Sequence, residues 1–470
     1  LGCAGARILG VQFSKGDYIT FLDDDDEWEN NNLKHQLQIF QKNPTLDIVM
    51  CGYQVQSDNT EKHIYNMEPF AINFKQMIHR RPGPFFQCCM FRNKILENIE
   101  DLAIILTTEQ GKPLKEAKGE ILYGSSFVEF YAEEAKRVKG ETILAPNKNQ
   151  KIITEIEPIG VVGAITPWNF PSAMISRKVS PAIACGCAVV LKPSELTPFS
   201  ALALAYLAKE AGVFDGVFNV ITGEAEEIGK EICENFNVRK LSFTGSTKVG
   251  KLLNEACAKD LKRVSLELGG SAPFIVCKDA NLDNAVKGLM HAKFRNGGQA
   301  CTCVNRIFVA KEVHDEFVQK LVTEVKKLKI GDGFTESDIG PMINENAKIK
   351  VKTLVEDAIK NGAKVEIGNL EDKGLFFTPT ILTNVKSDME IANQEIFGAV
   401  GAIQKFDSID EVIKLSNNTK YGLGSYLYSE NQSTIFKISN ALEFGMVAIN
   451  GDSFATELAP FGGIKHSGFG

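Results

Sequence analysis

Two residues stand out as able to do chemistry together. Cys301 lies in Phe294-Arg-Asn-Gly-Gly-Gln-Ala-Cys-Thr-Cys303, and Glu267 lies in the apolar run Leu266-Glu-Leu-Gly-Gly270. A thiolate attacks an electrophilic carbon, and a carboxylate can activate the water that hydrolyses the adduct. Alone, most cysteines are small buried hydrophobic residues, and a Glu before Gly-Gly commonly ends a strand. If the fold brings the two together, they predict covalent catalysis followed by base-assisted hydrolysis.

The sequence around these residues alternates short apolar runs with helical periodicity. The runs predict strands at 160–165, 188–191, 217–221, 240–243, 273–276 and 306–309, and helices at 201–208, 225–235, 248–258 and 281–294. Continuous apolar strands alternating with helices predict a parallel sheet covered on both faces. A looser alternation from 312 to 450 predicts a second α/β domain.

Composition is typical of a globular protein. The 470 residues, of which 44% are hydrophobic and 24% charged, predict two to three domains. A net charge of −7 without a basic cluster argues against nucleic-acid binding. No apolar run has the length of a membrane span, and no signal peptide is visible. The 11 cysteines form no dense disulfide pattern, so we expect a reducing compartment, the cytoplasm.

The first 95 residues do not follow this pattern. An apolar strand leads into the acidic run Asp23-Asp-Asp-Asp-Glu27, and such a run is usually a solvated turn. With Gly5-Ala-Arg-Ile-Leu-Gly10 before it, however, the segment resembles the family-2 glycosyltransferases. That resemblance implies that Asp23 and Asp25 bind a metal ion and a nucleotide-sugar. The family's first strand and its base region are missing, so we expect an α/β fragment without transferase activity.

From about residue 96 to the end, the chain resembles the NAD(P)-dependent aldehyde dehydrogenases, most closely the succinate-semialdehyde branch. Besides the two segments above, the matching motifs are Thr108-Glu-Gln-Gly-Lys-Pro113, Glu116-Ala-Lys-Gly-Glu120, Thr166-Pro-Trp-Asn-Phe-Pro171, Lys192-Pro-Ser-Glu195, Phe243-Thr-Gly-Ser-Thr-Lys-Val-Gly250, Glu395-Ile-Phe-Gly398 and Pro460-Phe-Gly-Gly-Ile-Lys465. The resemblance implies an NAD-binding, doubly wound parallel sheet at 96–266, with an oligomerisation hairpin near 140–157. A catalytic α/β domain would follow at 267–470.

The resemblance also implies how the catalytic residues act. Cys301 would form a thiohemiacetal with the aldehyde and then a thioester. The side-chain amide of Asn169 and the Cys301 backbone N–H would stabilise the oxyanion. Glu267 would activate water, a task for which we expect a partly buried carboxylate of raised pKa. Without these neighbours, Asn169 would be taken for a turn residue and Glu267 for an ordinary ion-pair partner.

No Gly-x-Gly-x-x-Gly fingerprint is present. Instead, Gly245 and Ser246 lie between a strand and a helix, where helix N–H groups can bind a pyrophosphate, although Ser246 also suits a simple N-cap. The resemblance places Lys192 and Glu195 at the adenine ribose. A carboxylate there binds both ribose hydroxyls and repels a 2′-phosphate, which predicts NAD over NADP. The remaining cofactor positions implied by the family are Trp168, Glu395 and Phe397.

Two arginines indicate the substrate. Arg177 and Arg295 match family positions that bind the distal carboxylate of succinic semialdehyde, and a guanidinium suits a planar carboxylate. A serine that assists in this branch is replaced by Ala455. Glutarate semialdehyde, lactaldehyde and glycolaldehyde therefore remain alternatives.

Cys303 predicts a redox switch, because relatives with this Cys-x-Cys form a reversible disulfide between the two positions. The alternative is a passive small side chain. The match lacks the family's first tens of residues and its C-terminal strand, which joins a neighbouring subunit. A homo-oligomer, expected for the family, is therefore in doubt, and an inactive truncated chimera is a further alternative.

Overall fold

The computed structural model describes residues 98–211, 213–371 and 373–469, together with short pieces of the first 97 residues. These pieces are helical positions 34, 37, 38, 41 and 42 and the strands β1 (Tyr18–Thr20), β2 (Ile48–Met50), β3 (Tyr53–Val55), β4 (His63–Tyr65), β5 (Phe70–Ile72) and β6 (Met90–Arg92). β1, β6, β2 and β5 form an antiparallel sheet, and β3 pairs with β4. Asp23 and Asp25 lie outside the described residues, so the structure does not test the metal-site prediction.

A six-stranded sheet contains the strands predicted at 160–165, 188–191, 217–221 and 240–243. Its order is β11 (Phe218–Val220), β10 (Ala188–Lys192), β9 (Val161–Ile165), β12 (Val238–Thr244), β13 (Arg263–Glu267) and β21 (Gly468–Phe469). All neighbours are parallel except β13 and β21. At Gly468, with φ of 112°, a Cβ atom would collide with the carbonyl of Leu266, so the close approach of this edge strand requires glycine.

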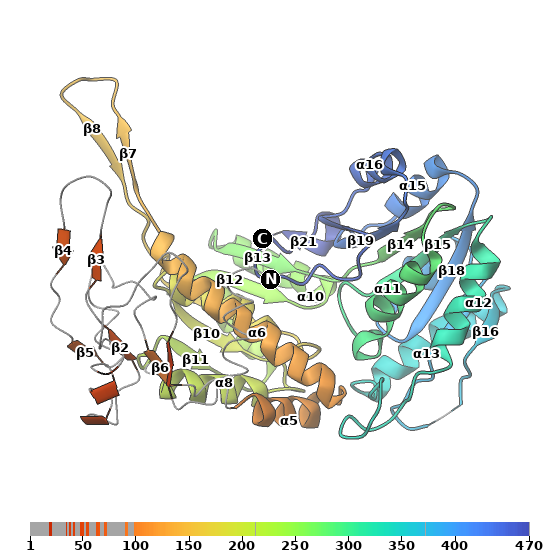
Figure 1. Cartoon of the computed structure of the whole chain (residues 1–470), viewed down its shortest axis with the longest axis horizontal. Helices are drawn as coiled ribbons and strands as arrows, with labels where there is room; N and C mark the ends of the chain where they lie inside the picture. Colours follow the sequence, from red (N-terminus) through yellow and green to blue (C-terminus); the bar gives the residue numbers. More distant parts are fainter. Residues whose placement is uncertain are drawn as a thin grey trace.

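Helices cover both faces of this sheet (Figure 1). They are α7 (Ala173–Ala184), α8 (Phe199–Glu210), α9 (Ala225–Glu234) and α10 (Thr247–Ala258). Ala164 of β9 packs with α7 and α8, whereas its neighbour Ile165 packs on the other side with α9 and α10. This alternation is the doubly wound arrangement that the apolar runs predicted. Two helices, α5 (Ile99–Gln110) and α6 (Leu114–Glu134), pack on each other and reach α7 and α8.

After Glu267 the chain crosses to a second sheet of seven strands. Its order is β16 (Lys364–Ile367), β17 (Thr380–Thr383), β18 (Val400–Phe406), β15 (Val304–Ala310), β14 (Ala272–Val276), β19 (Gly424–Tyr428) and β20 (Met446–Ile449). Only β16 is antiparallel to its neighbour. The strands predicted at 273–276 and 306–309 lie at its centre and are fully buried.

The second sheet is also covered on both faces. Its helices are α11 (Leu282–Phe294), α12 (His314–Val325), α13 (Glu345–Lys360), α14 (Glu390–Asn393), α15 (Ile409–Asn417) and α16 (Gln432–Ala441). Phe274 of β14 packs with α11 and α12, and the adjacent Ile275 packs with α15 and α16. The looser alternation after residue 312 therefore belongs to a second α/β unit, as predicted.

A β-hairpin projects from the body of the protein (Figure 1). It consists of β7 (Glu141–Leu144) and β8 (Lys151–Thr154), and all of its strand residues are exposed. The hairpin lies where the sequence predicted one. Among the described residues, no helix combines the length and the apolar composition needed to cross a membrane.

The buried centre of the second sheet gives a prediction about stability. Ile307 of β15 is fully buried, so Ile307→Ala removes methyl groups from a packed core and should lower the free energy of unfolding by about 2–5 kcal/mol. Urea denaturation followed by circular dichroism measures this. Ile349→Ala on α13, where the side chain is 51% exposed, is the matched control and should change stability by less than about 0.5 kcal/mol. Equal effects of the two substitutions would contradict this packing.

Candidate active site

The predicted site residues meet at a cavity of about 790 Å³ between the two sheets. Ten of them line it, namely Trp168, Asn169, Arg177, Gly245, Ser246, Glu267, Arg295, Cys301, Glu395 and Phe397. Ala455, in place of the expected serine, also lines it. Lys192, Glu195 and Cys303 are not among the lining residues. Segments far apart in the sequence therefore supply one site.

Cys301 follows a tight turn between α11 and β15. The turn, Arg295–Gly298, contains three successive left-handed residues, of which Asn296 with φ of 52° is not a glycine. At Gly298 a Cβ atom would collide with the carbonyl of Gly398, so this position requires glycine. Burial raises the pKa of the Cys301 thiol to about 11, although the cation of Arg177 acts in the opposite direction. The thiol is therefore protonated at neutral pH.

Asn296 holds this turn through all of its polar groups. Its side-chain amide donates to the carbonyls of Asn169 and Gln299, and its side-chain oxygen accepts from Gln110. Its backbone N–H donates to Glu116. A left-handed non-glycine residue costs about 1–3 kcal/mol, and these bonds hold it in place. Sequence reasoning missed Asn296, although its place beside the Gly-Gly pair was a signal.

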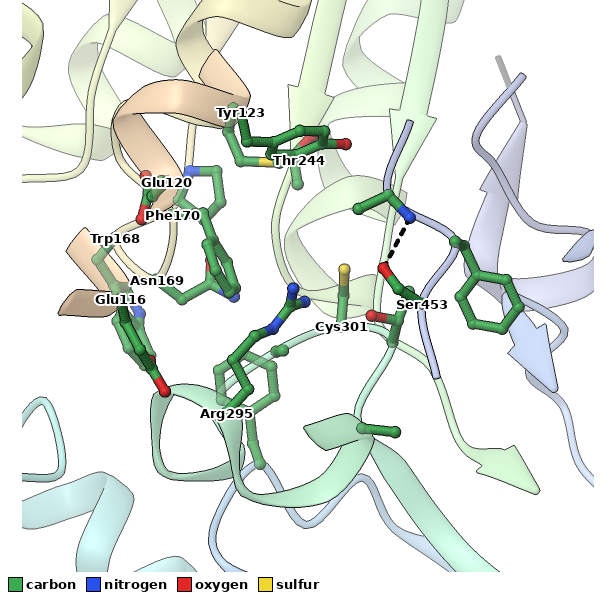
Figure 2. A pocket seen from close by; sticks show the side chains of 18 of the residues that line it. Glu116, Glu120, Tyr123, Trp168, Asn169, Phe170, Thr244, Arg295, Cys301 and Ser453 are labelled. Carbon is green, nitrogen blue, oxygen red and sulfur yellow. Dashed lines mark hydrogen bonds between the residues drawn. The ribbon is translucent and has the colours of Figure 1, made fainter. Parts of the chain in front are cut away.

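Asn169 lies in the loop between β9 and α7 and lines the same cavity as Cys301 (Figure 2). One side-chain N–H donates to the carbonyl of Gln299 at 3.0 Å, which leaves the second amide hydrogen available to the cavity. The Asn169 carbonyl accepts from Lys112, whose ammonium also lies 4.0 Å from the centre of the Phe170 ring.

A buried ion pair supports this loop. Lys112 and Glu120 are 2.6 Å apart, and both side chains are 1% exposed. Glu120 also accepts the N–H groups of Ser172 and Ala173 at the start of α7. Both residues lie in motifs that carried the family resemblance, but no role was predicted for either. In the sequence, each is a single charged residue with no spacing that indicates a partner.

Glu267 ends β13 and contacts Arg177 and Thr244, both at 3.2 Å. The expected raised pKa was wrong. Burial acts to raise the pKa of Glu267, but the cations of Lys178 and Arg177 and the two hydrogen bonds outweigh it, so the pKa is lowered. Lys178 follows Arg177 in α7 and donates to Ser242. The sequence prediction considered burial without these cations.

The two arginines line the same cavity in different settings. Arg177 donates to Glu267 and, at 2.7 Å, to the hydroxyl of Tyr123. Arg295 lies beside Cys301 (Figure 2), with its guanidinium 5.1 Å from the centre of the Phe170 ring. Neither Tyr123 nor its bond to Arg177 was predicted. A tyrosine one turn after Glu120 on α6 offers no distinctive sequence signal.

Five of the expected cofactor positions line the same cavity, namely Trp168, Gly245, Ser246, Glu395 and Phe397. Ser246 caps the N-terminus of α10, where first-turn N–H groups lack partners within the helix and suit a pyrophosphate. Trp168 and Phe397 pack edge to face at 5.6 Å. Glu395 accepts the N–H of Gly270, and burial raises its pKa. This donor set fits a dinucleotide.

Lys192 and Glu195 pair at the carboxyl end of β10 in the first sheet. The two are 2.8 Å apart, with Lys192 buried and the Glu195 side chain 64% exposed. The hydrogen bond from Lys192 lowers the pKa of Glu195, which keeps the carboxylate ionised. An exposed carboxylate of this kind can accept bonds from ribose hydroxyls.

Cys303 is buried beside α11. Its sulfur lies 3.3 Å from the ammonium of Lys293 and can donate to the carbonyl of the same residue at 3.4 Å. Burial raises the pKa of Cys303 despite this cation. In this conformation Cys303, the predicted disulfide partner of Cys301, is held against α11.

The succinate-semialdehyde branch has a serine at the position of Ala455, which has no side-chain hydroxyl. Its backbone N–H donates to the hydroxyl of Ser453, which lies beside Cys301 (Figure 2). Ser453 is therefore a polar group of the cavity that sequence reasoning missed.

Comparisons with known proteins identify the family to which most of the chain is similar. Residues 89–470 match the model of the aldehyde dehydrogenase family, and residues 1–100 match that of glycosyl transferase family 2. The chain is 53% identical to glutarate-semialdehyde dehydrogenase of Pseudomonas putida, over 80% of this chain and 78% of the relative. It is 52% identical to succinate-semialdehyde dehydrogenase [NADP(+)] of Escherichia coli, over 80% and 79%.

A solved structure shows the same fold. Succinate-semialdehyde dehydrogenase from Burkholderia pseudomallei superposes with a TM-score of 0.79 at 52% identity, covering 80% of this chain and 79% of that one. The α/β architecture predicted from the sequence is thereby confirmed. The chain belongs to the aldehyde dehydrogenase family, whose members are NAD(P)-dependent oxidoreductases.

Proposed function

We propose that the chain oxidises a short aldehyde that carries a distal carboxylate, with succinic semialdehyde as the first candidate and glutaric semialdehyde as the second. The observation that carries this proposal is that Arg177 and Arg295 line the same cavity as Cys301. A guanidinium binds a planar carboxylate through two parallel hydrogen bonds. The names of the two curated relatives support this substrate class.

In this proposal, Cys301 releases its proton to solvent and attacks the aldehyde carbon as a thiolate. Its own backbone N–H and the free amide hydrogen of Asn169 stabilise the oxyanion. When bound, the nicotinamide accepts the hydride that leaves the adduct. The residues that would hold the dinucleotide are Trp168, Gly245, Ser246, Glu395 and Phe397, with Lys192 and Glu195 at the adenine ribose.

The second half of the reaction is hydrolysis of the thioester. Glu267 accepts a proton from water as the water oxygen bonds to the acyl carbon. The carbon–sulfur bond then breaks, the carboxylic acid leaves, and Cys301 departs as a thiolate. Glu267 lines the same cavity as Cys301, so its carboxylate can serve as the base for the water that attacks the acyl group there.

Several expectations from the sequence remain proposals. We propose a glycosyltransferase-like fragment at 1–95, a cofactor domain at 96–266 and a catalytic domain at 267–470. The exposed hairpin would pair with another copy of the chain, and the cytoplasm is the proposed location. Lactaldehyde or glycolaldehyde oxidation, and an inactive chain that still binds the cofactor, are the alternatives.

The redox switch between Cys301 and Cys303 is also a proposal. Its support is the flexible glycine pair before Cys301 and the close spacing of the two thiols. Disulfide formation would require Cys303 to leave Lys293, with which its sulfur is in contact. A switch of this kind therefore needs a rearranged turn.

The substrate proposal predicts a clear preference. Succinic semialdehyde should give a kcat/KM about 10- to 150-fold above that of butanal, because each hydrogen bond to a charged group contributes about 1.5–3 kcal/mol. NADH absorbance measures this. Cys301→Ala should abolish turnover, and Cys185→Ala, at an exposed cysteine, is the matched control that should not. Equal efficiency with both aldehydes would contradict the proposal, and a folded, NAD-binding chain without turnover would favour the inactive alternative.

The raised thiol pKa predicts how the free enzyme reacts with iodoacetamide. The alkylation rate of Cys301 should still rise about tenfold per pH unit up to pH 10, because only the thiolate reacts and its pKa is about 11. Peptide mass spectrometry separates this site from other cysteines, and Cys301→Ala gives the background. A plateau below pH 8 would show a thiolate already formed in the free enzyme.

The ribose assignment predicts cofactor choice. The unaltered chain should prefer NAD, and Glu195→Gln should raise the kcat/KM for NADP about tenfold or more, because the carboxylate that repels the 2′-phosphate is removed. Steady-state kinetics with both cofactors measure the ratio. Glu356→Gln, an exposed glutamate on α13, is the control and should leave it unchanged. Comparable efficiency of the unaltered chain with both cofactors would overturn the assignment.

A further inference from the structure

We infer that Arg177 is a positioning residue that restrains Glu267 until a substrate carboxylate arrives, so that thioester hydrolysis depends on that carboxylate. This inference rests on the proposed function, in which Arg177 binds the distal carboxylate and Glu267 is the base. It adds a coupling between these two roles. A substrate with a distal carboxylate is then favoured twice, once when it binds and once when its thioester is hydrolysed.

The geometry of Arg177 supports this coupling. One end of its guanidinium, Nη1, lies 3.2 Å from Oε2 of Glu267, and the other, Nη2, lies 2.7 Å from the hydroxyl of Tyr123. The guanidinium also lies 4.1 Å from the centre of the Phe461 ring. Helix α7, Tyr123 of α6 and Phe461 therefore fix the position of this cation beside Glu267.

Arg177 retains unused donors. Among the described residues, its buried Nε has no hydrogen-bond partner. A guanidinium offers five N–H donors, and the two bonds above use only part of them. The side chain lines the cavity that also contains Cys301. A second carboxylate entering this cavity can therefore bind the same cation that Glu267 already contacts.

When two carboxylates bind one guanidinium, their negative charges repel each other and each is held less strongly by the cation. A substrate carboxylate bound to the unused donors of Arg177 shares the cation with Glu267 and adds negative charge beside it, which weakens the Arg177–Glu267 bond. The groups that face Glu267 are Arg177 and Lys178 from α7, Thr244 from β12, Tyr123 from α6 and the thiol of Cys301. Of these, only the cations and hydrogen bonds lower the pKa of Glu267. Weakening the Arg177 bond raises the proton affinity of Glu267 and makes it a stronger base.

The affected step is the hydrolysis already described. Water adds its oxygen to the acyl carbon and passes one proton to Glu267, the carbon–sulfur bond breaks, and the acid leaves. No oxidant or further reactant is required. A succinyl group on Cys301 carries the activating carboxylate itself, whereas an acetyl group does not. Acetate, however, supplies the two carbons that the acetyl group lacks, one of which is the carboxylate carbon.

Arg295 provides an internal comparison. It lines the same cavity and approaches Phe170, but within the described ranges it forms no ion pair with a carboxylate. Arg295→Gln should therefore weaken recognition of the substrate carboxylate without releasing Glu267. Arg177→Gln should weaken recognition and release Glu267 together.

The test measures hydrolysis directly. The chain with NAD is given a pulse of acetaldehyde, and the decay of the acetyl group on Cys301 is followed by acid quench and mass spectrometry. Acetate should accelerate this decay saturably by about three- to tenfold, the effect of about half to one pKa unit on the base. Acetamide at equal ionic strength is the neutral control and should have no effect. If acetate only slows the decay or leaves it unchanged, the inference is wrong.

The variants separate this role from simple binding or structure. Arg177→Gln should hydrolyse its acetyl group faster than the unaltered chain and ignore acetate, whereas Cys185→Ala, at an exposed cysteine outside the cavity, should keep the unaltered basal rate. Slower hydrolysis in Arg177→Gln would overturn the inference. The acetate measurement on the unaltered chain holds whether or not a variant folds. Failure of the proposed function is visible separately, as equal kcat/KM for succinic semialdehyde and butanal.

Discussion

The geometry of the active site depends on the buried ion pair between Lys112 and Glu120. Removing two charges from water is costly, and their attraction compensates only when the remaining donors and acceptors are also satisfied. Here Glu120 accepts the first N–H groups of α7, and Lys112 donates to the carbonyl of Asn169. Asn296 donates to the same carbonyl. The pair therefore joins α6, α7 and the turn before Cys301 into one hydrogen-bonded unit.

Charge around the cavity then sets the resting state. The thiol of Cys301 has a raised pKa because it is buried, and the carboxylate of Glu267 has a lowered pKa because Lys178 and Arg177 outweigh its burial. Proton transfer from the thiol to Glu267 is therefore uphill in the free enzyme. The first shift opposes the thiolate that attack on an aldehyde requires, whereas the second keeps Glu267 ionised but makes it a weaker base. Ligands that change the charge near Arg177 can reverse the second shift, which links substrate binding to base strength.

The sequence predicted the fold class, and ten of the residues that it singled out line one cavity. Continuous apolar runs located four of the six strands of the first sheet and the two central strands of the second, since strands buried on two faces have little choice of side chain. The motifs that carried the family resemblance contain many of the residues that line the cavity. Interactions between distant segments were not predictable. Lys112 and Asn169 have no pattern linking them, and Arg177 and Lys178 are adjacent on a helix, about 100° apart, yet both act on Glu267.

The two arginines show why residue type alone does not define a role. Both present a guanidinium to one cavity, but Arg177 is fixed by Tyr123 and Glu267, whereas Arg295 lies against Phe170. Arg177 is already bonded to the carboxylate of Glu267. A substrate carboxylate can compete for this guanidinium only if its acyl chain is long enough to reach it. The separation of Arg177 from Cys301 therefore determines which acyl chain lengths place a carboxylate there. Chain-length preference and base strength then follow from the same fixed side chain, which couples specificity to rate.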